Sequence, residues 1–161
     1  MPEENRLGPE GAGVSIFATS MESERGYILS SQLGAMQRQL EEAIEFARER
    51  RQFGQPVGRF QSVSNRIVDM KLRIETCRLM LYKLAWLESQ CESLAMDAAL
   101  TKLHLSETFV ESSLDAIRLH GAQGFVQELG IERNLRDGIG GLIYSGTSDI
   151  QRNVIARLLG L

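Results

Sequence analysis

Apolar residues between positions 63 and 87 recur at steps of four and three, and this spacing constrains the fold more than any other feature of the sequence. The stripe consists of Val63, Ile67, Met70, Ile74, Cys77, Leu81, Leu84 and Leu87. Such steps place every member on one face of an α-helix. A long helix with a single apolar face needs other helices to cover it, so this segment predicts part of the core of a helical bundle.

Two further segments have the same period and predict partners for this helix. A long first helix is expected from about Ile16 to a hairpin turn at residues 54–58, because Pro56 disfavours the helical state of its predecessor and the flanking glycines lower helix stability. Another helix is expected over residues 94–119. The apolar faces of the two helices are Leu33, Met36, Leu40, Ile44 and Ala47 in the first, and Ala98, Leu103, Phe109, Leu114 and Ile117 in the second.

Glycines divide the last third of the chain. Gly121 and Gly124 are expected to end the preceding helix. A short helix follows at about residues 128–136, and the glycines at 138, 140 and 141 are expected to break the chain again. The final helix is predicted over residues 148–159, with Gly160 as its terminator. Its inward face would be Ile150, Val154, Ile155 and Leu158.

The organisation of the chain follows from these segments. Residues 1–14 are rich in glycine, proline and glutamate, which predicts a linker or arm. Residues 15–161 are long enough for one helical domain with its own core. The sequence shows no strand pattern and no repeat of fixed period. We therefore predict an all-α fold, an up-down four-helix bundle with a short extra C-terminal helix.

The composition argues against several classes of function. The chain has 161 residues, a formal net charge of −3 and basic residues scattered among acidic ones, so no basic face is set aside for nucleic acid or for a membrane surface. No apolar run approaches the length of a membrane span, and the first residues, MPEENRLGPEG, lack the basic and apolar parts of a signal peptide. We expect a cytoplasmic protein that contacts neither nucleic acid nor membrane.

The cysteines and histidines argue against a metal site. Cys77 and Cys91 both fall in helical pattern without CxxC spacing, so we expect reduced thiols in the core or partly buried. A di-iron bundle needs Glu-x-x-His pairs, and neither His104 nor His120 has a glutamate three residues before it. The sequence therefore predicts no metal.

The stretch YSGTSDIQR, residues 144–152, places a hydroxyl-rich glycine turn at the start of the final helix. Thr147 and Ser148 are good N-cap residues, and Ser148 with Gln151 makes a weak capping box. Such a helix start favours an anionic or hydrogen-bond-accepting ligand, but the pattern also fits a capped surface helix. Ser145 has no histidine near it in sequence, so alone it predicts an inert hydroxyl.

Several motifs occur together in a known order. They are ERGYILSSQLGAMQRQLEEAIEFARERRQFGQPVGRFQ, RLHGAQGF, RNLRD and YSGTSDIQRNVIARLLG. In order and spacing this set, from about Asn5 to Leu161, resembles the C-terminal helical domain of the acyl-CoA dehydrogenases. The resemblance implies part of an FAD-dependent enzyme that introduces an α,β-double bond into an acyl thioester. Family members have a helical domain and a β-domain before this one, so it also implies a fragment or one piece of a split enzyme.

The resemblance also implies where the catalytic base lies. Most members have a glutamate directly after the tyrosine of the last turn, where this chain has Ser145. A branch of the family instead places the glutamate near the start of this domain, immediately before an arginine, and here that pair is Glu24 and Arg25. Glu24 is therefore the implied base, against the alternative of an exposed helix glutamate. Arg25 would contact substrate or remain solvated, and Tyr144 matches a residue that lines the acyl pocket.

FAD contacts carry over from the family at ten positions. Around the first turn they are Arg50, Gln52, Phe53, Phe60 and Gln61, which would reach an FAD held mainly by another subunit. Further on they are Arg118, Gly121, Ala122, Thr147 and Asp149. Arg118 replaces the usual glutamine and Ala122 the usual second loop glycine, which puts the adenosine contact in doubt. Phe53 is equally suited to staple the helix turn, and His120 fits a helix-end cap.

The resemblance leaves the substrate open between acyl-CoA and an acyl or aminoacyl group on a carrier protein. It implies a homo-oligomer, which is a tetramer in the full-length family, and an electron-transferring flavoprotein is a candidate electron acceptor. The alternative function is a catalytically silent helical subunit that pairs with an active flavoprotein chain. We expect the isolated 161 residues to be inactive and to retain no FAD.

Overall fold

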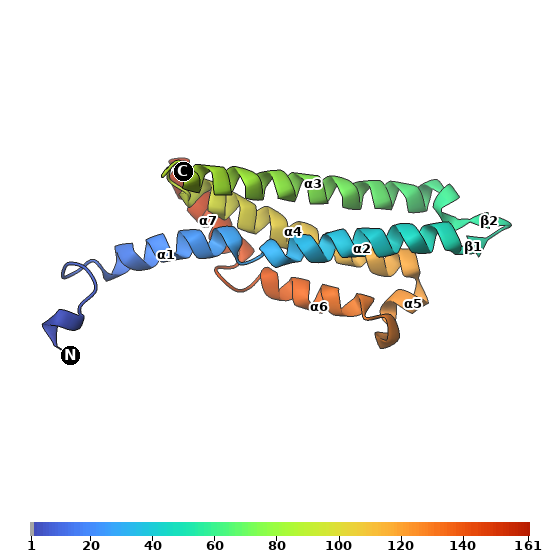
Figure 1. Cartoon of the computed structure of the whole chain (residues 1–161), viewed down its shortest axis with the longest axis horizontal. Coiled ribbons are helices and arrows are strands. Elements are labelled where there is room, and N and C mark those ends of the chain that lie inside the picture. Colours follow the sequence, from blue (N-terminus) through green and yellow to red (C-terminus); the bar gives the residue numbers. More distant parts are fainter. Residues whose placement is uncertain (1) are drawn as a thin grey trace.

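The chain folds into an elongated, almost entirely helical structure, which a computed structural model describes for residues 2–161 (Figure 1). The predicted all-α class is confirmed. None of the helices in this range is long and apolar enough to cross a membrane. The elements in chain order, with η for short 3-10 helices, are η1 (Glu3–Asn5), α1 (Gly13–Tyr27), α2 (Ser30–Glu49), β1 (Arg51–Gln52), β2 (Gln55–Pro56), η2 (Val57–Arg59), α3 (Gln61–Ser89), α4 (Ala95–His120), α5 (Ala122–Phe125), η3 (Gln127–Leu129), α6 (Ile131–Gly141) and α7 (Ser148–Leu158).

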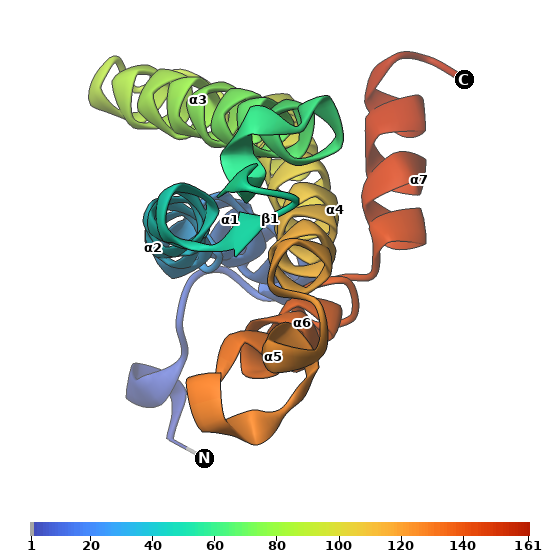
Figure 2. The ribbon, with the colours of Figure 1, turned by 90° about the vertical axis from the view of Figure 1, so that its right-hand side faces the viewer.

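Helix α4 lies at the centre of the structure. It packs against α1, α2, α3, α5, α6 and α7, and Figure 2 shows α2, α3, α6 and α7 arranged around it. The apolar stripe of the sequence is the inner face of α3, as predicted. Each fully buried Met, Leu, Ile or Phe stabilises the fold by about 1.5–3 kcal/mol. The core where α2, α3 and α4 meet includes Met36, Leu40, Met70, Ile74, Leu105 and Phe109.

The first helix is broken, contrary to the single long helix predicted. Helix α1 ends at Tyr27 and α2 begins at Ser30. Between them Leu29 has φ −94° and ψ 3°, and its side chain is buried. Nearby, Gly26 approaches α3 so closely that an added Cβ would lie 2.4 Å from Leu84 Cδ2. The prediction was wrong because the burial of Leu29 and the packing of α1 against α4 and α3 outweigh the local helix preference.

The turn predicted at residues 54–58 begins as a two-residue β-hairpin. Strands β1 and β2 pair antiparallel. Phe53 and Gly54 form the tip of the hairpin, with φ angles of 52° and 79°. Figure 1 shows the hairpin at the far end of α2 from α1, so it is well separated from the N-terminal part of the chain.

The last third differs from the prediction at its glycines. Helix α6 runs from Ile131 to Gly141 instead of over residues 128–136, and the glycines expected to break the chain lie inside it. A Cβ added at Gly138 would lie 3.2 Å from the Phe109 ring, and one at Gly141 would lie 2.9 Å from the Gln32 amide. These glycines therefore allow α6 to approach α4 and α2, and this packing outweighs their low helix preference.

Helix α7 has nearly the predicted bounds, and Gly160 follows it with a φ of 82°. Its inward face differs, because Gln151 is fully buried while Ile150 and Leu158 are each nearly half exposed. The predicted apolar inward face is therefore wrong at Ile150 and Leu158. Helix α7 meets the rest of the chain partly through polar contacts.

The two cysteines have different environments, and both thiols are free. Cys77 is buried in the core, and this burial raises the pKa of its thiol. Cys91 lies just after α3 with a φ of 56° and is exposed, so its predicted helical and partly buried position is wrong. The segment after α3 contains turns, which is why helical periodicity does not continue through it.

Candidate active site

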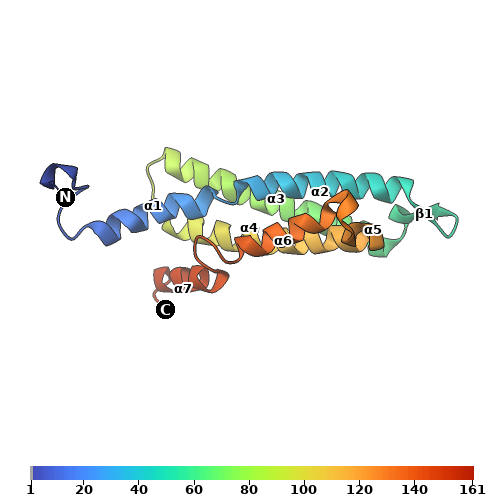
Figure 3. The same cartoon turned by 90° about the horizontal axis from the view of Figure 1, so that it is seen from below.

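Glu24 and Ser145 meet in the structure although 121 residues separate them in sequence. The Ser145 hydroxyl donates a hydrogen bond to Glu24 Oε1 at 2.6 Å. Glu24 lies in the last turns of α1, and Ser145 lies in the loop between α6 and α7. Figures 1 and 3 both show this loop beside the junction of α1 and α2. The proposed base and the residue at the usual position of the base therefore share one site.

The backbone of the loop is unusual at two neighbouring residues. Ser145 has a φ of 55°, a conformation that few residues other than glycine adopt. Gly146 has a φ of 90°, and a Cβ added there would lie 2.5 Å from Gln151 Nε2. Only glycine therefore fits at position 146 without displacing Gln151.

Two buried side chains fix the carbonyl groups of this loop. Gln151 Nε2 donates to the carbonyl oxygens of Ser145 and Gly146, each at 3.1 Å. Lys102 Nζ donates to the Gly146 carbonyl at 2.7 Å. Both side chains are 0% exposed. Because buried polar groups that are hydrogen-bonded resist displacement, Lys102 and Gln151 act as a clamp on residues 145–146.

Lys102 is a site residue that the sequence reasoning missed. Burial lowers the pKa of its ammonium group, Arg25 lowers it further and Glu107 acts in the opposite direction. The signal was present in the sequence: Lys102 lies four residues after Ala98 and seven before Phe109, on the apolar face of α4. A lysine in such a register needs a polar partner, and here that partner is the loop carbonyl.

The start of α7 confirms Thr147 as an N-cap residue but not the predicted capping box. Thr147 is the N-cap, and its hydroxyl accepts from the Ile150 backbone N–H at 3.3 Å. The predicted capping box is wrong, because Gln151 turns its amide to the loop and the Ser148 hydroxyl has no hydrogen-bond partner among residues 2–161. Thr147 and Asp149, two proposed FAD contacts, are both exposed at the start of α7.

Arg25 and Tyr144 flank the contact between Glu24 and Ser145. Arg25 is half-buried, and its Nε atom is buried without a hydrogen-bond partner among the described residues. The Tyr144 hydroxyl accepts from Gln32 Nε2 at 3.3 Å, while much of the side chain is exposed. Arg25 and Tyr144 are the sequence neighbours of Glu24 and Ser145, but among these residues only the Ser145 hydroxyl bonds to the Glu24 carboxylate.

The proposed FAD contacts near the hairpin lie at the other end of α2. Helix α2 has 20 residues and is therefore about 30 Å long. Arg50, Gln52 and Gln61 are exposed and Phe60 is half-buried. Phe53 is 92% exposed, and its ring meets that of Phe60 edge-on with centroids 6.1 Å apart. The structure does not bring this group together with Glu24 in one chain.

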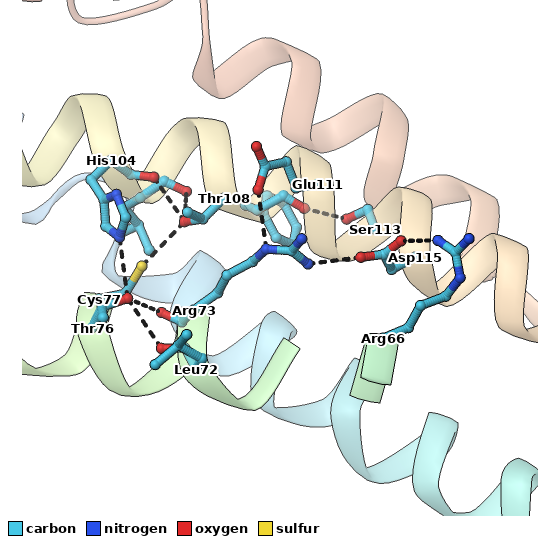
Figure 4. A network of polar contacts seen from close by, with 12 residues as sticks. Arg66, Leu72, Arg73, Thr76, Cys77, His104, Thr108, Glu111, Ser113 and Asp115 are labelled. Atoms are coloured by element: carbon cyan, nitrogen blue, oxygen red, sulfur yellow. Dashed lines mark hydrogen bonds and ion pairs between the residues drawn. The ribbon is translucent and has the colours of Figure 1, made fainter. Parts of the chain in front are cut away.

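Arg118 belongs to a charge network between α3 and α4. Asp115, whose side chain is 7% exposed, accepts from Arg66 at 2.7 Å, from Arg73 at 2.8 Å and from Arg118 at 3.3 Å. Figure 4 shows the first two of these ion pairs beside Glu111, which also pairs with Arg73. Burial raises the pKa of Asp115, but the hydrogen bonds from Arg73 and Arg66 outweigh this and leave the pKa below its usual range.

The loop after α4 holds the other two proposed contacts. Gly121 has a φ of 61°, and Ala122 begins α5; both are exposed. His120 Nδ1 lies 2.8 Å from the Ala116 carbonyl, and its ring lies 4.4 Å from that of Phe46. His120 is thus occupied at the end of α4, as the helix-end interpretation expected.

The motifs, the fold and the Glu24 position lead to a comparison with known proteins. Residues 11–160 match the family model for the acyl-CoA dehydrogenase C-terminal domain. The chain belongs to the acyl-CoA dehydrogenase family. It is 50% identical over 161 residues to the L-prolyl-[peptidyl-carrier protein] dehydrogenase of Pseudomonas fluorescens, covering all of this chain and 42% of that protein.

Two solved structures are also similar to the chain. The crystal structure of the prolyl acyl carrier protein oxidase AnaB has a TM-score of 0.97 and 48% identity, covering all of this chain and 43% of that one. PigA with FAD and proline has a TM-score of 0.95 and 48% identity, covering all of this chain and 42% of that one. The chain therefore spans about two fifths of the length of these family members.

Proposed function

We propose that this chain forms the C-terminal part of an FAD-dependent enzyme that introduces an α,β-double bond into a thioester-bound acyl or aminoacyl group. The observation that carries the proposal is the hydrogen bond between Glu24 and Ser145. It places a carboxylate at the loop where most family members have their base, although the loop itself has only a hydroxyl. Membership of the family supplies the reaction type.

Glu24 acts as the general base in this proposal. Its carboxylate takes the proton from the carbon next to the thioester carbonyl, and the neighbouring carbon loses a hydride. Two C–H bonds break, one carbon–carbon double bond forms, and two electrons leave with the hydride. A serine hydroxyl cannot take this proton unaided near neutral pH, so Ser145 does not replace the carboxylate. Arg25, with its unpartnered buried Nε, is proposed to contact the substrate, and Tyr144 to line the acyl pocket.

The exposed residues of the chain fit FAD as a ligand. Arg50 forms no ion pair within the described residues, and a free guanidinium suits a diphosphate. Phe53 and Gln52 extend the same surface, while Thr147 and Asp149 lie near Glu24 at the start of α7. Bound FAD would accept the hydride. We further propose contacts from Phe60, Gln61, Arg118, Gly121 and Ala122, although Arg118 already pairs with Asp115.

The separation of these two groups supports a homo-oligomer. Because α2 spans about 30 Å between them, the hairpin residues and the Glu24 loop would contact two different FAD molecules. A second copy of the chain would then complete each site, in agreement with the tetramer implied by the family resemblance. The electron acceptor, with an electron-transferring flavoprotein as candidate, and a cytoplasmic location stay predictions.

We propose a carrier-protein-bound aminoacyl group, specifically a prolyl group, as the substrate. The Pseudomonas fluorescens relative is named an L-prolyl-[peptidyl-carrier protein] dehydrogenase, and AnaB is named a prolyl acyl carrier protein oxidase. Both are about half identical to this chain over its full length. An acyl-CoA is the competing substrate, because the family as a whole is named for it.

The test uses the full-length protein with bound FAD under anaerobic conditions. Prolyl-carrier protein and butyryl-CoA are mixed with it separately, and bleaching of the flavin absorbance is followed. We expect bleaching with the prolyl thioester, and a loss of about 10²- to 10⁴-fold in rate for Glu24→Gln, because the base is lost while the side-chain shape is kept.

The matched control is Glu22→Gln, which changes a neighbouring carboxylate of α1 and should leave the rate unchanged. Normal bleaching by Glu24→Gln would contradict the assignment of the base. No bleaching with either thioester would instead support the silent assembly subunit.

A further inference from the structure

We propose that Ser145 is a positioning residue that fixes the orientation of the Glu24 carboxylate, and that Lys102 and Gln151 hold it in place for this task. This inference rests on the proposed function, because it assigns a role to Ser145 only if Glu24 is the base. The proposed function concerns the base, Glu24, whereas this inference concerns Ser145, which cannot itself take the substrate proton.

The contact between the two side chains is short and directional. The Ser145 hydroxyl donates to Glu24 Oε1 at 2.6 Å, a distance typical of a hydroxyl bonded to an ionised carboxylate. Glu24 is an exposed helix residue whose side chain would otherwise sample several rotamers. The bond engages one carboxylate oxygen and leaves Oε2 as the proton acceptor. Catalysis by a base depends on holding this oxygen near the reacting proton.

The conformation of Ser145 indicates that its position is imposed by the surrounding structure. A φ of 55° is unfavourable for a residue with a side chain, and such residues persist where their neighbours over-determine them. Here the neighbours are three hydrogen bonds from two fully buried side chains, Gln151 and Lys102, to the carbonyls of residues 145 and 146. Together they direct the hydroxyl toward α1.

Two substitutions at position 145 separate the hydroxyl from the backbone. Ser145→Ala removes the hydroxyl and keeps the constraint on φ. Ser145→Gly also removes the hydroxyl but adopts positive φ without strain. If the hydroxyl positions Glu24, both variants should reduce the flavin about tenfold more slowly, with unchanged substrate Kd. Full activity in Ser145→Gly would overturn the inference, because it would show that only the backbone matters.

A double-mutant cycle in the full-length FAD-bound protein distinguishes the inference from the proposed function. With the thioester that bleaches the unmodified enzyme, Ser145→Ala should add no further loss to Glu24→Gln, because the hydroxyl acts through the carboxylate. Deuterium at the carbon next to the carbonyl should slow Ser145→Ala more than the unmodified enzyme, since proton removal becomes more rate-limiting. Ser89→Ala, which removes an exposed hydroxyl at the end of α3, is the matched control.

The outcomes point to different conclusions. A slow Glu24→Gln with a normal Ser145→Ala would overturn the positioning role and leave the proposed function intact. A normal Glu24→Gln would overturn both. Independent, additive losses would assign Ser145 a role unconnected with Glu24. Lys102→Met, which keeps the buried stem and removes the donor, should be slowed in the same way, and a normal rate there would remove Lys102 from the proposal.

Discussion

The loop at residues 144–147 and the hairpin tip at Phe53 each hold a side-chain-bearing residue in the left-handed backbone region, but their surroundings differ. Ser145 has a φ of 55°; the buried Gln151 side chain bonds to its carbonyl, and Gln151 and the buried Lys102 both bond to the next carbonyl, that of Gly146. Phe53, with a φ of 52°, is 92% exposed and touches Phe60 edge-on. The chain itself stabilises the first conformation far more than the second.

This difference distinguishes a loop that is held by contacts within its own chain from a hairpin whose tip has few such contacts. The Glu24 loop brings together residues of α1, α4 and α7 within one chain. The hairpin instead presents an aromatic ring and arginine side chains outward. We infer that the loop is organised before any ligand binds, whereas the hairpin gains its contacts from FAD and a second copy of the chain.

The largest effect should come from adding a methyl group at the loop glycine. Gly146→Ala combines left-handed strain with a clash, because the new Cβ would lie 2.5 Å from Gln151 Nε2. We expect it to lower the free energy of unfolding by about 2–4 kcal/mol. Urea denaturation of the full-length protein measures this.

The matched control is Gly54→Ala at the hairpin, where φ is 79° but nothing lies within 4 Å of the new Cβ. Only the strain remains there, so the expected loss is about 1–2 kcal/mol. Equal losses at the two glycines would show that Gln151 moves aside freely and that the loop is not clamped.

The sequence predicts helices well wherever one apolar face decides the structure. The stripe from Val63 to Leu87 has the helical period throughout, and α3 forms there. The break at Leu29 could not be read in the same way, because nothing in the local sequence stops a helix and the cause is the burial of Leu29 in the core. The glycines of α6 were wrongly predicted to break the chain for a similar reason. They allow close packing against Phe109 and Gln32, which are distant in sequence.

The site was less predictable than the fold. Glu24 was identified by its position in a family motif, and no local pattern connects it with Ser145 across 121 residues. Gln151 was assigned to a capping box because its spacing from Ser148 fits one. In the structure its amide instead donates a hydrogen bond to the Ser145 carbonyl of the loop. Lys102, which was missed, could have been identified from the sequence, because it is a charged residue on the apolar face of a predicted helix.

A smaller effect is expected where α1 is joined to α3, on the Glu24 side of the molecule. The Tyr27 hydroxyl donates to Glu88 Oε2 at 2.7 Å. Burial, together with the hydrogen bond and charge of Glu88, raises the pKa of Tyr27 from its ordinary 10.0 to about 12. Tyr27→Phe should therefore lose about 1 kcal/mol of stability.

The pH dependence of that loss follows from the direction of the shift. Because the folded state favours the protonated phenol, the contribution of Tyr27 is complete below pH 10.0 and disappears as pH rises through about 12. Denaturation curves of the two proteins should thus differ below pH 10.0 and converge as the pH approaches about 12, and the step in tyrosinate absorbance near pH 12 should be smaller in Tyr27→Phe. A constant difference at all pH values would contradict the shift.

The smallest effect on stability is expected at the hairpin tip. Since Phe53 is 92% exposed, Phe53→Ala should change the free energy of unfolding by no more than about 0.5 kcal/mol. If the ring packs against FAD, its loss should weaken FAD binding roughly two- to tenfold, the range for an aromatic contact. Titration of the apoprotein with FAD measures this Kd.

Tyr82→Ala is the control for this last comparison, because Tyr82 is an exposed aromatic residue on α3, away from the hairpin. An unchanged FAD Kd for Phe53→Ala would mean that the hairpin tip does not contact the cofactor. Equal weakening by both substitutions, accompanied by dissociation of the oligomer, would place the effect in assembly instead. Selective weakening by Phe53→Ala would show that FAD supplies the contacts that the exposed Phe53 lacks in the chain alone. At Ser145 the chain itself supplies the corresponding contacts.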